Sequence, residues 1–161
     1  MGLGFDVHAL VEDAGVTFVL GGVEIPFEKG LLGHSDADVL AHAVTDALLG
    51  AAGLEDIGHY FPDTDDQFKD ADSIELLRRV RTVVGESWQV ANVDAVVICE
   101  RPKIRDYRDE IKRNLASALD IEPSRVGVRG TTSERLGFTG RGEGIAAQAV
   151  CLLESLQDSG R

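Results

Sequence analysis

Short apolar segments of strand character alternate along this chain with segments of helical periodicity, and this alternation constrains the fold more than any other feature. The strand-like segments span 3–8, 17–25, 89–100, 125–130 and 145–153, with a turn or bulge expected at Gly21-Gly22. The helical segments span 35–52, about 73–84 and about 105–119. The pattern predicts an α/β (α+β) domain in which a mixed β-sheet is covered on one face by about three helices.

Length and residue usage indicate one globular domain. The 161 residues fit a single hydrophobic core without repeats or a flexible linker, so we expect one domain over 1–161. The longest apolar run, 93–99, contains Asp94 and is too short to span a membrane. The first residues resemble neither a signal nor a transit peptide, which favours a cytoplasmic location. Cys99 and Cys151 lie in apolar runs, where buried free thiols are expected more than a disulfide.

The charge balance limits the partners. The chain has 28 acidic and 16 basic side chains, a formal charge of -12, which repels nucleic acids and anionic lipid surfaces. A small phosphorylated substrate would meet the same repulsion unless cations were supplied locally. An acidic chain that handles phosphate should therefore contain metal ligands. Two long polar loops, 55–66 and 130–144, are the places where a site is expected.

Asp6 and His8 lie two residues apart in a predicted strand, so both side chains project from one face and could grip a metal ion. Alone, such a pair is more often exposed or simply hydrogen-bonded. His42 lies opposite the apolar stripe of the first helix, on the face of Asp38 and Asp46. It is either a solvated histidine in surface ion pairs or a third metal ligand oriented by a neighbouring carboxylate. Together, Asp6, His8 and His42 would form an open zinc site with a fourth position for substrate phosphate.

Two further groups could hold phosphate. His34-Ser35 stands where the first helix is predicted to begin, and the N–H groups and dipole of a helix N-terminus attract anions. His34 is then a donor to phosphate or an ordinary loop residue. The run Thr131-Thr132-Ser133-Glu134 offers hydroxyls for phosphate and a carboxylate for a cation such as Mg²⁺, or is a turn with a capping glutamate. Arg141, between two glycines, could bind phosphate or lie on the surface.

These groups belong to a series of motifs that covers nearly the whole chain in order. The series is Gly4-Phe5-Asp6-Val7-His8, His34-Ser35-Asp36-Ala37-Asp38, Asp56-Ile57-Gly58, Phe61-Pro62-Asp63-Thr64-Asp65, Pro102-Lys103, Thr131-Thr132-Ser133-Glu134 and Leu136-Gly137-Phe138-Thr139-Gly140-Arg141-Gly142-Glu143-Gly144. It closely resembles the 2-C-methyl-D-erythritol 2,4-cyclodiphosphate synthase family.

The resemblance implies a reaction of the non-mevalonate isoprenoid pathway. In that reaction, 4-diphosphocytidyl-2-C-methyl-D-erythritol 2-phosphate becomes the cyclic 2,4-diphosphate and releases CMP. The substrate's 2-phosphate attacks its own β-phosphate, so the protein needs no side-chain nucleophile and acts by positioning and charge neutralisation.

The resemblance also implies roles for single residues. The zinc ligands would be Asp6, His8 and His42, and Glu134 would hold a second metal, Mg²⁺ or Mn²⁺. His34 and Thr132 would flank the reacting phosphates as catalytic residues. The remaining substrate contacts would be Ser35 on the erythritol phosphate, Asp56, Ile57 and Gly58 on the ribose, Phe61, Pro62, Asp63, Thr64 and Asp65 on the methylerythritol, and Pro102, Lys103, Thr131 and Ser133 around the cytidine diphosphate.

The resemblance also implies a homotrimer whose sites lie between neighbouring subunits. Phe138, Arg141 and Glu143 match a segment near the three-fold axis, where the family has a cavity for isoprenoid phosphates. The departures are Ser133 and Arg135, which keep a hydroxyl and a charge, and Glu100-Arg101, which could alter nucleotide preference. Two other interpretations remain: a metal-dependent phosphohydrolase with a zinc-bound water, and a trimeric binding module for isoprenoid phosphates.

Overall fold

Five strands form one mixed sheet in the computed structural model, which describes residues 1–13 and 15–156. The strand order is β4-β1-β7-β5-β6, and only β5 and β6 pair in parallel. The strands are β1 (Gly2–Val11), β4 (Gly30–Leu32), β5 (Trp88–Ile98), β6 (Val126–Thr131) and β7 (Gly144–Ser155). The strand-like segment at 17–25 is a hairpin of β2 (Val19–Leu20) and β3 (Val23–Glu24), with the expected turn at Gly21 and Gly22, both in left-handed conformation.

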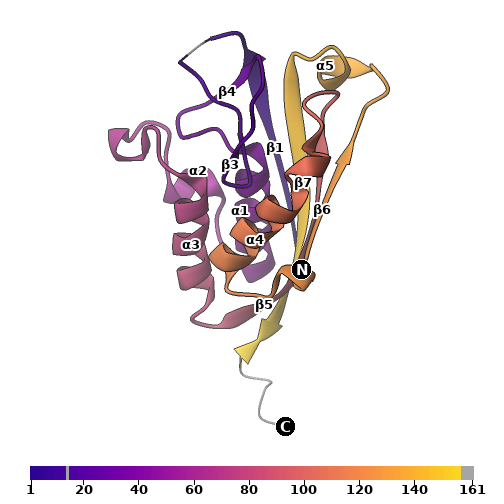
Figure 1. The fold of residues 1–161 in the computed structure, drawn as a ribbon. Helices are drawn as coiled ribbons and strands as arrows, with labels where there is room; N and C mark the ends of the chain where they lie inside the picture. Colours follow the sequence, from indigo (N-terminus) through magenta and orange to yellow (C-terminus); the bar gives the residue numbers. More distant parts are fainter. Residues whose placement is uncertain (14, 157–161) are drawn as a thin grey trace.

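Three main helices cover one face of the sheet, as the alternating pattern predicts (Figure 1). They are α1 (Val39–Ala52), α3 (Ser73–Val84) and α4 (Arg108–Leu119). Shorter turns complete the chain: α2 (Ile57–Tyr60), α5 (Gly137–Gly140), η1 (Asp66–Phe68), η2 (Ile104–Asp106) and η3 (Pro123–Arg125). The prediction of an α+β domain with a mixed sheet is confirmed. No helix within 1–13 and 15–156 has the length and apolarity needed to cross a membrane.

The opposite face of the sheet carries exposed apolar side chains. Along β1, the side chains of Leu3, Phe5 and Val7 alternate with those that face the helices, and Leu3 and Phe5 are 61% and 58% exposed. Val150 and Leu152 of the neighbouring strand β7 are also exposed. An uncovered apolar surface of this kind is typical of a protein–protein contact.

Helix α1 begins later than predicted. Asp38, not Ser35, is its N-cap: one carboxylate oxygen of Asp38 accepts the N–H of Ala41 at 3.0 Å, and the other accepts the N–H of Gly22 at 2.7 Å. Burial raises the pKa of Asp38, which is fully enclosed. The predicted helix start at Ser35 is therefore wrong: the N-cap lies three residues further on, so the N-terminal N–H groups of α1 are at Asp38 and not at Ser35. Similarly, α4 begins at Arg108, after the short turn η2.

Glycines on β1 let helix α1 approach the sheet closely. A Cβ atom at Gly4 would lie 1.9 Å from the carbonyl oxygen of Ala43, and one at Gly2 would lie 2.2 Å from that of Ala47. The prediction of a single apolar stripe on α1 is too narrow, because the helix lies between the sheet and α3 and is buried almost all round. Asp6 and His8, the next two residues on the same face of β1, are therefore also brought close to α1.

Replacing Gly4 by alanine is expected to destabilise the fold by about 2–3 kcal/mol, because α1 must move away from β1. Urea unfolding measures the change. Gly50→Ala is the matched control, since its Cβ would meet nothing closer than the carbonyl oxygen of Leu3 at 3.9 Å and the position is helical. The control should be neutral or slightly stabilising. Equal stability of both variants would contradict the close packing of α1 on β1.

The two cysteines are buried free thiols, as predicted. Burial raises the pKa of Cys99 to about 11 and that of Cys151 to about 12. Both thiols are therefore protonated at neutral pH, and neither is a candidate nucleophile.

Candidate metal centre and substrate cavities

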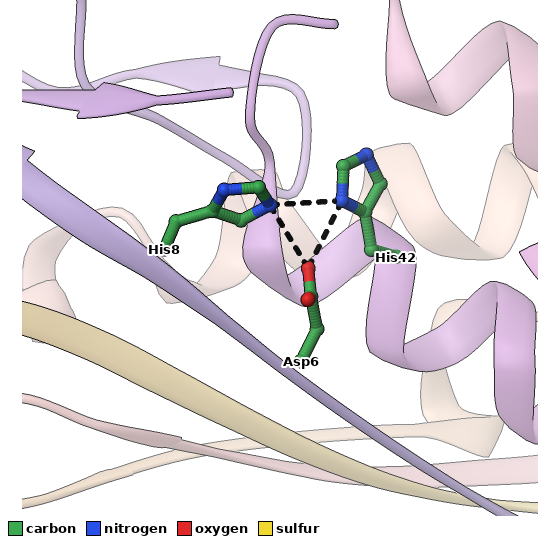
Figure 2. A group of neighbouring side chains, drawn as sticks. All are labelled: Asp6, His8 and His42. Carbon is green, nitrogen blue, oxygen red and sulfur yellow. Dashed lines mark hydrogen bonds and ion pairs between the residues drawn. The ribbon is translucent and has the colours of Figure 1, made fainter. Parts of the chain in front are cut away.

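Asp6, His8 and His42 meet as the sequence predicts, two from β1 and one from α1 (Figure 2). Asp6 Oδ2 lies 3.0 Å from both His8 Nε2 and His42 Nδ1, and the two ring nitrogens are 3.1 Å apart. A tetrahedral Zn²⁺ with bonds near 2.0 Å separates its ligand atoms by about 3.3 Å. The three atoms therefore form one triangular face of such a site, and the fourth position is open to a ligand.

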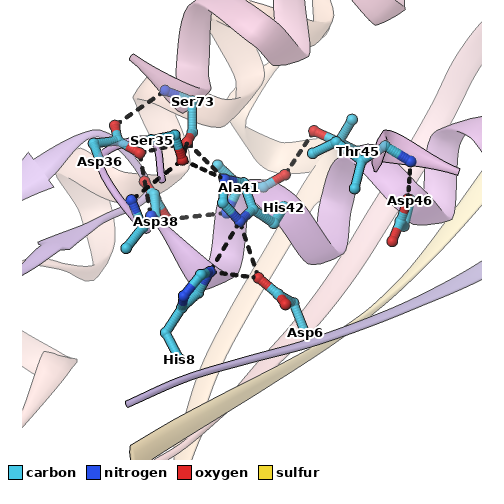
Figure 3. A network of polar contacts seen from close by, with 12 residues as sticks. Asp6, His8, Ser35, Asp36, Asp38, Ala41, His42, Thr45, Asp46 and Ser73 are labelled. Atoms are coloured by element: carbon cyan, nitrogen blue, oxygen red, sulfur yellow. Dashed lines mark hydrogen bonds and ion pairs between the residues drawn. The ribbon is translucent and has the colours of Figure 1, made fainter. Parts of the chain in front are cut away.

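The unused ring nitrogens of both histidines have partners that fix the rings. His8 Nδ1 donates to the backbone oxygen of Leu32 on β4 at 2.9 Å, which leaves Nε2 as the ligand atom. His42 Nε2 lies 2.8 Å from Ser73 Oγ and 3.1 Å from Ser35 Oγ. Ser73 Oγ in turn donates to Asp36 Oδ1 (Figure 3). Each histidine is thus oriented to present one lone pair to a cation.

The predicted carboxylate partner of His42 is wrong. Asp38 caps its helix, and Asp46 accepts the N–H of Ile57 at 2.8 Å. Both carboxylates lie one helical turn from His42, but each accepts a backbone N–H group and neither contacts the His42 ring. The hydroxyl of Ser73, at the start of α3, performs this role, with Asp36 behind it.

The charges of the three residues are coupled. Burial alone would raise the pKa of Asp6, but hydrogen bonds from His42 and His8 and their positive charge hold it well below its usual range. Burial alone would lower the pKa of His8, but the hydrogen bond and charge of Asp6 raise it above its ordinary value. Asp6 is therefore ionised at neutral pH, the form that a metal ion requires.

Ser73→Ala is expected to weaken zinc binding by about 10- to 100-fold, because His42 loses the nearer of the two hydroxyls that orient its ring. Competition with a chromophoric chelator measures the affinity. Ser117→Ala, in α4, is the control and should bind zinc as the unaltered protein does. Equal zinc affinity in the two variants would rule out an orienting role for Ser73.

A cavity of about 470 Å³ opens beside the triad. It brings together most of the residues predicted around the erythritol and ribose; its lining is His8, Gly33, His34, Ser35, His42, Ile57, Gly58, Phe61, Pro62, Asp63, Phe68 and Leu76. Three predicted residues stand outside this lining. Asp56 caps α2 by accepting the N–H of His59, Asp65 caps η1 while its backbone oxygen lies 3.1 Å from His34 Nε2, and Thr64 lies between Asp63 and Asp65 in the loop.

Three of the four residues predicted around the cytidine diphosphate, Pro102, Lys103 and Thr131, line a second cavity of about 300 Å³ at the end of β6, and Ser133 stands outside its lining. Its lining is Cys99, Pro102, Lys103, Ile104, Arg105, Arg108, Gly130, Thr131 and Thr132. Next to it, Thr132 Oγ1 donates to Glu134 Oε1 at 2.9 Å, and Ser133 Oγ lies 2.7 Å from Thr139 Oγ1. Three basic side chains give this cavity the positive charge that a diphosphate requires.

The two cavities share no lining residue, and α2 and β6 lie on opposite sides of the molecule in Figure 1. One chain therefore does not bring Thr132 and Glu134 together with the Asp6–His8–His42 triad. Among the described residues, Glu134 belongs to no cluster of three metal-ligating groups. A larger cavity of about 750 Å³ lies between α3, α4 and β5 and contains none of the predicted site residues.

Phe138 lies in α5 and Arg141 just after it, both within the polar loop 130–144. The Phe138 ring is partly exposed, and the Arg141 guanidinium makes a two-pronged ion pair with Glu143 at 2.8 and 3.0 Å. This pairing raises the pKa of Arg141 and lowers that of Glu143. Neither lines the two cavities described above.

Residues 1–154 match the YgbB family. The 2-C-methyl-D-erythritol 2,4-cyclodiphosphate synthase of Rubrobacter xylanophilus is 75% identical over 155 residues, which cover 96% of this chain and 94% of that protein. The synthase of Listeria innocua is 56% identical over 155 residues, covering 96% of this chain and 98% of that protein.

The fold is also similar to solved structures. IspF from Plasmodium falciparum in complex with CDP has a TM-score of 0.83 at 36% identity, covering 96% of this chain and 94% of that chain. A bifunctional IspDF from Campylobacter jejuni has a TM-score of 0.91 at 44% identity, covering 96% of this chain and 42% of that chain. The described strands and helices therefore follow the IspF fold.

Proposed function

The chain belongs to the YgbB family, and on that premise we propose that it converts 4-diphosphocytidyl-2-C-methyl-D-erythritol 2-phosphate to 2-C-methyl-D-erythritol 2,4-cyclodiphosphate. An oxygen of the 2-phosphate forms a bond to the β-phosphorus, and the bond from that phosphorus to the bridging oxygen breaks. CMP leaves with the bridging oxygen, so no water is consumed. The enzyme is then a cyclising phosphorus–oxygen lyase of isoprenoid precursor synthesis.

The Asp6–His8–His42 centre carries this proposal. Its three ligand atoms leave one open position beside a cavity that contains His34 and Ser35. A divalent metal held there would neutralise phosphate charge, which is the main obstacle to the approach of two phosphates. The residues themselves bind and orient the substrate: His34 and Thr132 flank the reacting phosphates, and Ser35 contacts the erythritol phosphate.

The cavity at the end of β6 is proposed to hold the cytidine diphosphate. Lys103, Thr131 and Thr132 line this cavity and, with the hydroxyl of Ser133 next in the chain, offer cationic and hydrogen-bonding groups to its phosphates. The CDP complex of the related Plasmodium structure supports this class of ligand. Residues 56–65 are proposed to close over the ribose and the methylerythritol.

We propose a homotrimer in which each site combines the metal cavity of one subunit with the nucleotide cavity of its neighbour. The separation of the two cavities within one chain supports this arrangement, since a single substrate must reach both. The exposed apolar face of β1 and β7 offers the surface for assembly. Phe138, Arg141 and Glu143 would then line a central cavity for an isoprenoid phosphate.

Glu134→Gln is expected to leave zinc bound but to raise the Mg²⁺ or Mn²⁺ concentration needed for half-maximal activity by about tenfold, because the hard cation loses its only protein carboxylate. The metal titration measures the shift, with zinc content determined in the same sample. An unchanged titration would remove Glu134 from the second metal site.

A product assay tests the function. Incubation with the methylerythritol substrate in H₂¹⁸O should give CMP and a cyclic diphosphate without solvent oxygen. A linear product carrying ¹⁸O would instead identify a metal-dependent hydrolase, and binding without turnover would identify a binding module.

A further inference from the structure

The loop that carries Thr132 and Glu134 adopts an unusual backbone conformation. Glu134 and Arg135 are consecutive residues with φ of 53° and 64°, in the left-handed region that side-chain-bearing residues rarely adopt. Two such residues in sequence persist only where surrounding contacts hold them. Both residues lie in the loop that connects β6 to α5.

One carboxylate oxygen holds this loop. Glu100 Oε1 accepts the N–H of Ser133 at 3.1 Å and the N–H of Arg135 at 3.1 Å, and it lies 3.5 Å from Ser133 Oγ. Glu100 is the second residue after β5, and the N–H of Cys99 just before it donates to the backbone oxygen of Thr131 at 3.0 Å. The loop is therefore tied to the end of β5 on both sides of Thr132.

Glu100 lies beside the nucleotide cavity, as the sequence suggests, since Cys99 and Pro102 on either side of Glu100-Arg101 line it. Its departure from the family pattern suggests an effect on nucleotide preference, but Glu100 is not among the residues that line the nucleotide cavity. Its neighbour Arg101 also points elsewhere, toward the ring of Phe27 and the carboxylate of Glu28. The Glu100 carboxylate faces backbone N–H groups rather than a base.

We propose that Glu100 is a positioning residue that holds the backbone of Ser133 and Arg135 so that Thr132 and Glu134 face the substrate phosphates. This inference rests on the proposed function for the roles of those two residues. The property of Glu100 that anchors the loop is its acceptor oxygen, not its negative charge. Glutamine has the same shape and keeps that oxygen, so it should replace glutamate here.

The experiment compares Glu100→Ala, Glu100→Gln and the control Glu24→Ala, which changes an exposed residue of β3. In Glu100→Ala, the amides of Ser133 and Arg135 should exchange hydrogen at least about tenfold faster, because their acceptor is gone. The kcat should fall by about 100-fold, as expected for a misplacement near 1 Å, while zinc content stays unchanged. Glu100→Gln and Glu24→Ala should both behave as the unaltered protein.

Unchanged amide exchange and kcat in Glu100→Ala would overturn the proposal. It would also be overturned if Glu100→Gln were as impaired as Glu100→Ala, because charge would then be the essential property. Failure of this proposal can be told apart from failure of the proposed function. If the unaltered protein forms no cyclic product, the synthase assignment is refuted. The amide exchange of Ser133 and Arg135 in Glu100→Ala still decides whether Glu100 anchors the loop.

Discussion

His42→Ala is expected to lose zinc and ring closure together, with activity reduced by at least about 1,000-fold, since the metal contributes several kcal/mol of charge stabilisation. His42 supplies one of three ligand atoms that lie within 3.1 Å of one another, and its removal leaves Asp6 and His8 as an incomplete pair. Metal analysis of the purified variant and the rate of CMP release measure both effects.

His59→Ala is the matched control for that experiment. His59 is an exposed histidine of α2 that stacks edge-on against Tyr60 and does not line the metal cavity. It should keep full zinc occupancy and activity. Full zinc occupancy in His42→Ala would contradict the metal assignment, as would undiminished ring closure by protein stripped with a chelator.

The metal triad could be predicted because its determinants are local. A strand places Asp6 and His8 on one face whatever the rest of the fold does, and helical periodicity places His42 away from the main apolar stripe. The packing of α1 on β1 is not local. The structure explains it by the glycines of β1, since Gly4 leaves room for the backbone of Ala43. The sequence therefore predicted the ligands more reliably than the contacts that support them.

The supporting contacts could not be predicted because they join residues far apart in the chain. Ser73 contacts His42 from the start of α3, and Asp36, in the loop before α1, contacts Ser73; neither position has a sequence pattern that shows this partner. The helix start was misplaced for a related reason: Ser35 and Asp38 both suit an N-cap, and the choice depends on Gly22 of a distant hairpin, which donates to Asp38. Periodicity carries no information about such partners.

The separation of the two cavities leads to a stronger test of assembly than a measurement of mass. His42→Ala removes function from the metal cavity, and Thr132→Ala removes it from the nucleotide cavity, so each variant alone should be inactive. When equal amounts are assembled into mixed trimers, half of the chains carry each intact cavity. About one quarter of the sites between neighbours then combine two intact cavities, and about one quarter of the unaltered activity should return.

This recovery depends on the site being shared. If the metal triad and Thr132 of the same chain acted together, every site in the mixture would lack one of them, and mixing would restore nothing. Variants mixed without subunit exchange provide the control and should stay inactive. Recovery near one quarter would place the reacting phosphates between Asp6, His8 and His42 of one subunit and Thr132 of the next, whereas its absence in verified mixed trimers would refute the shared site.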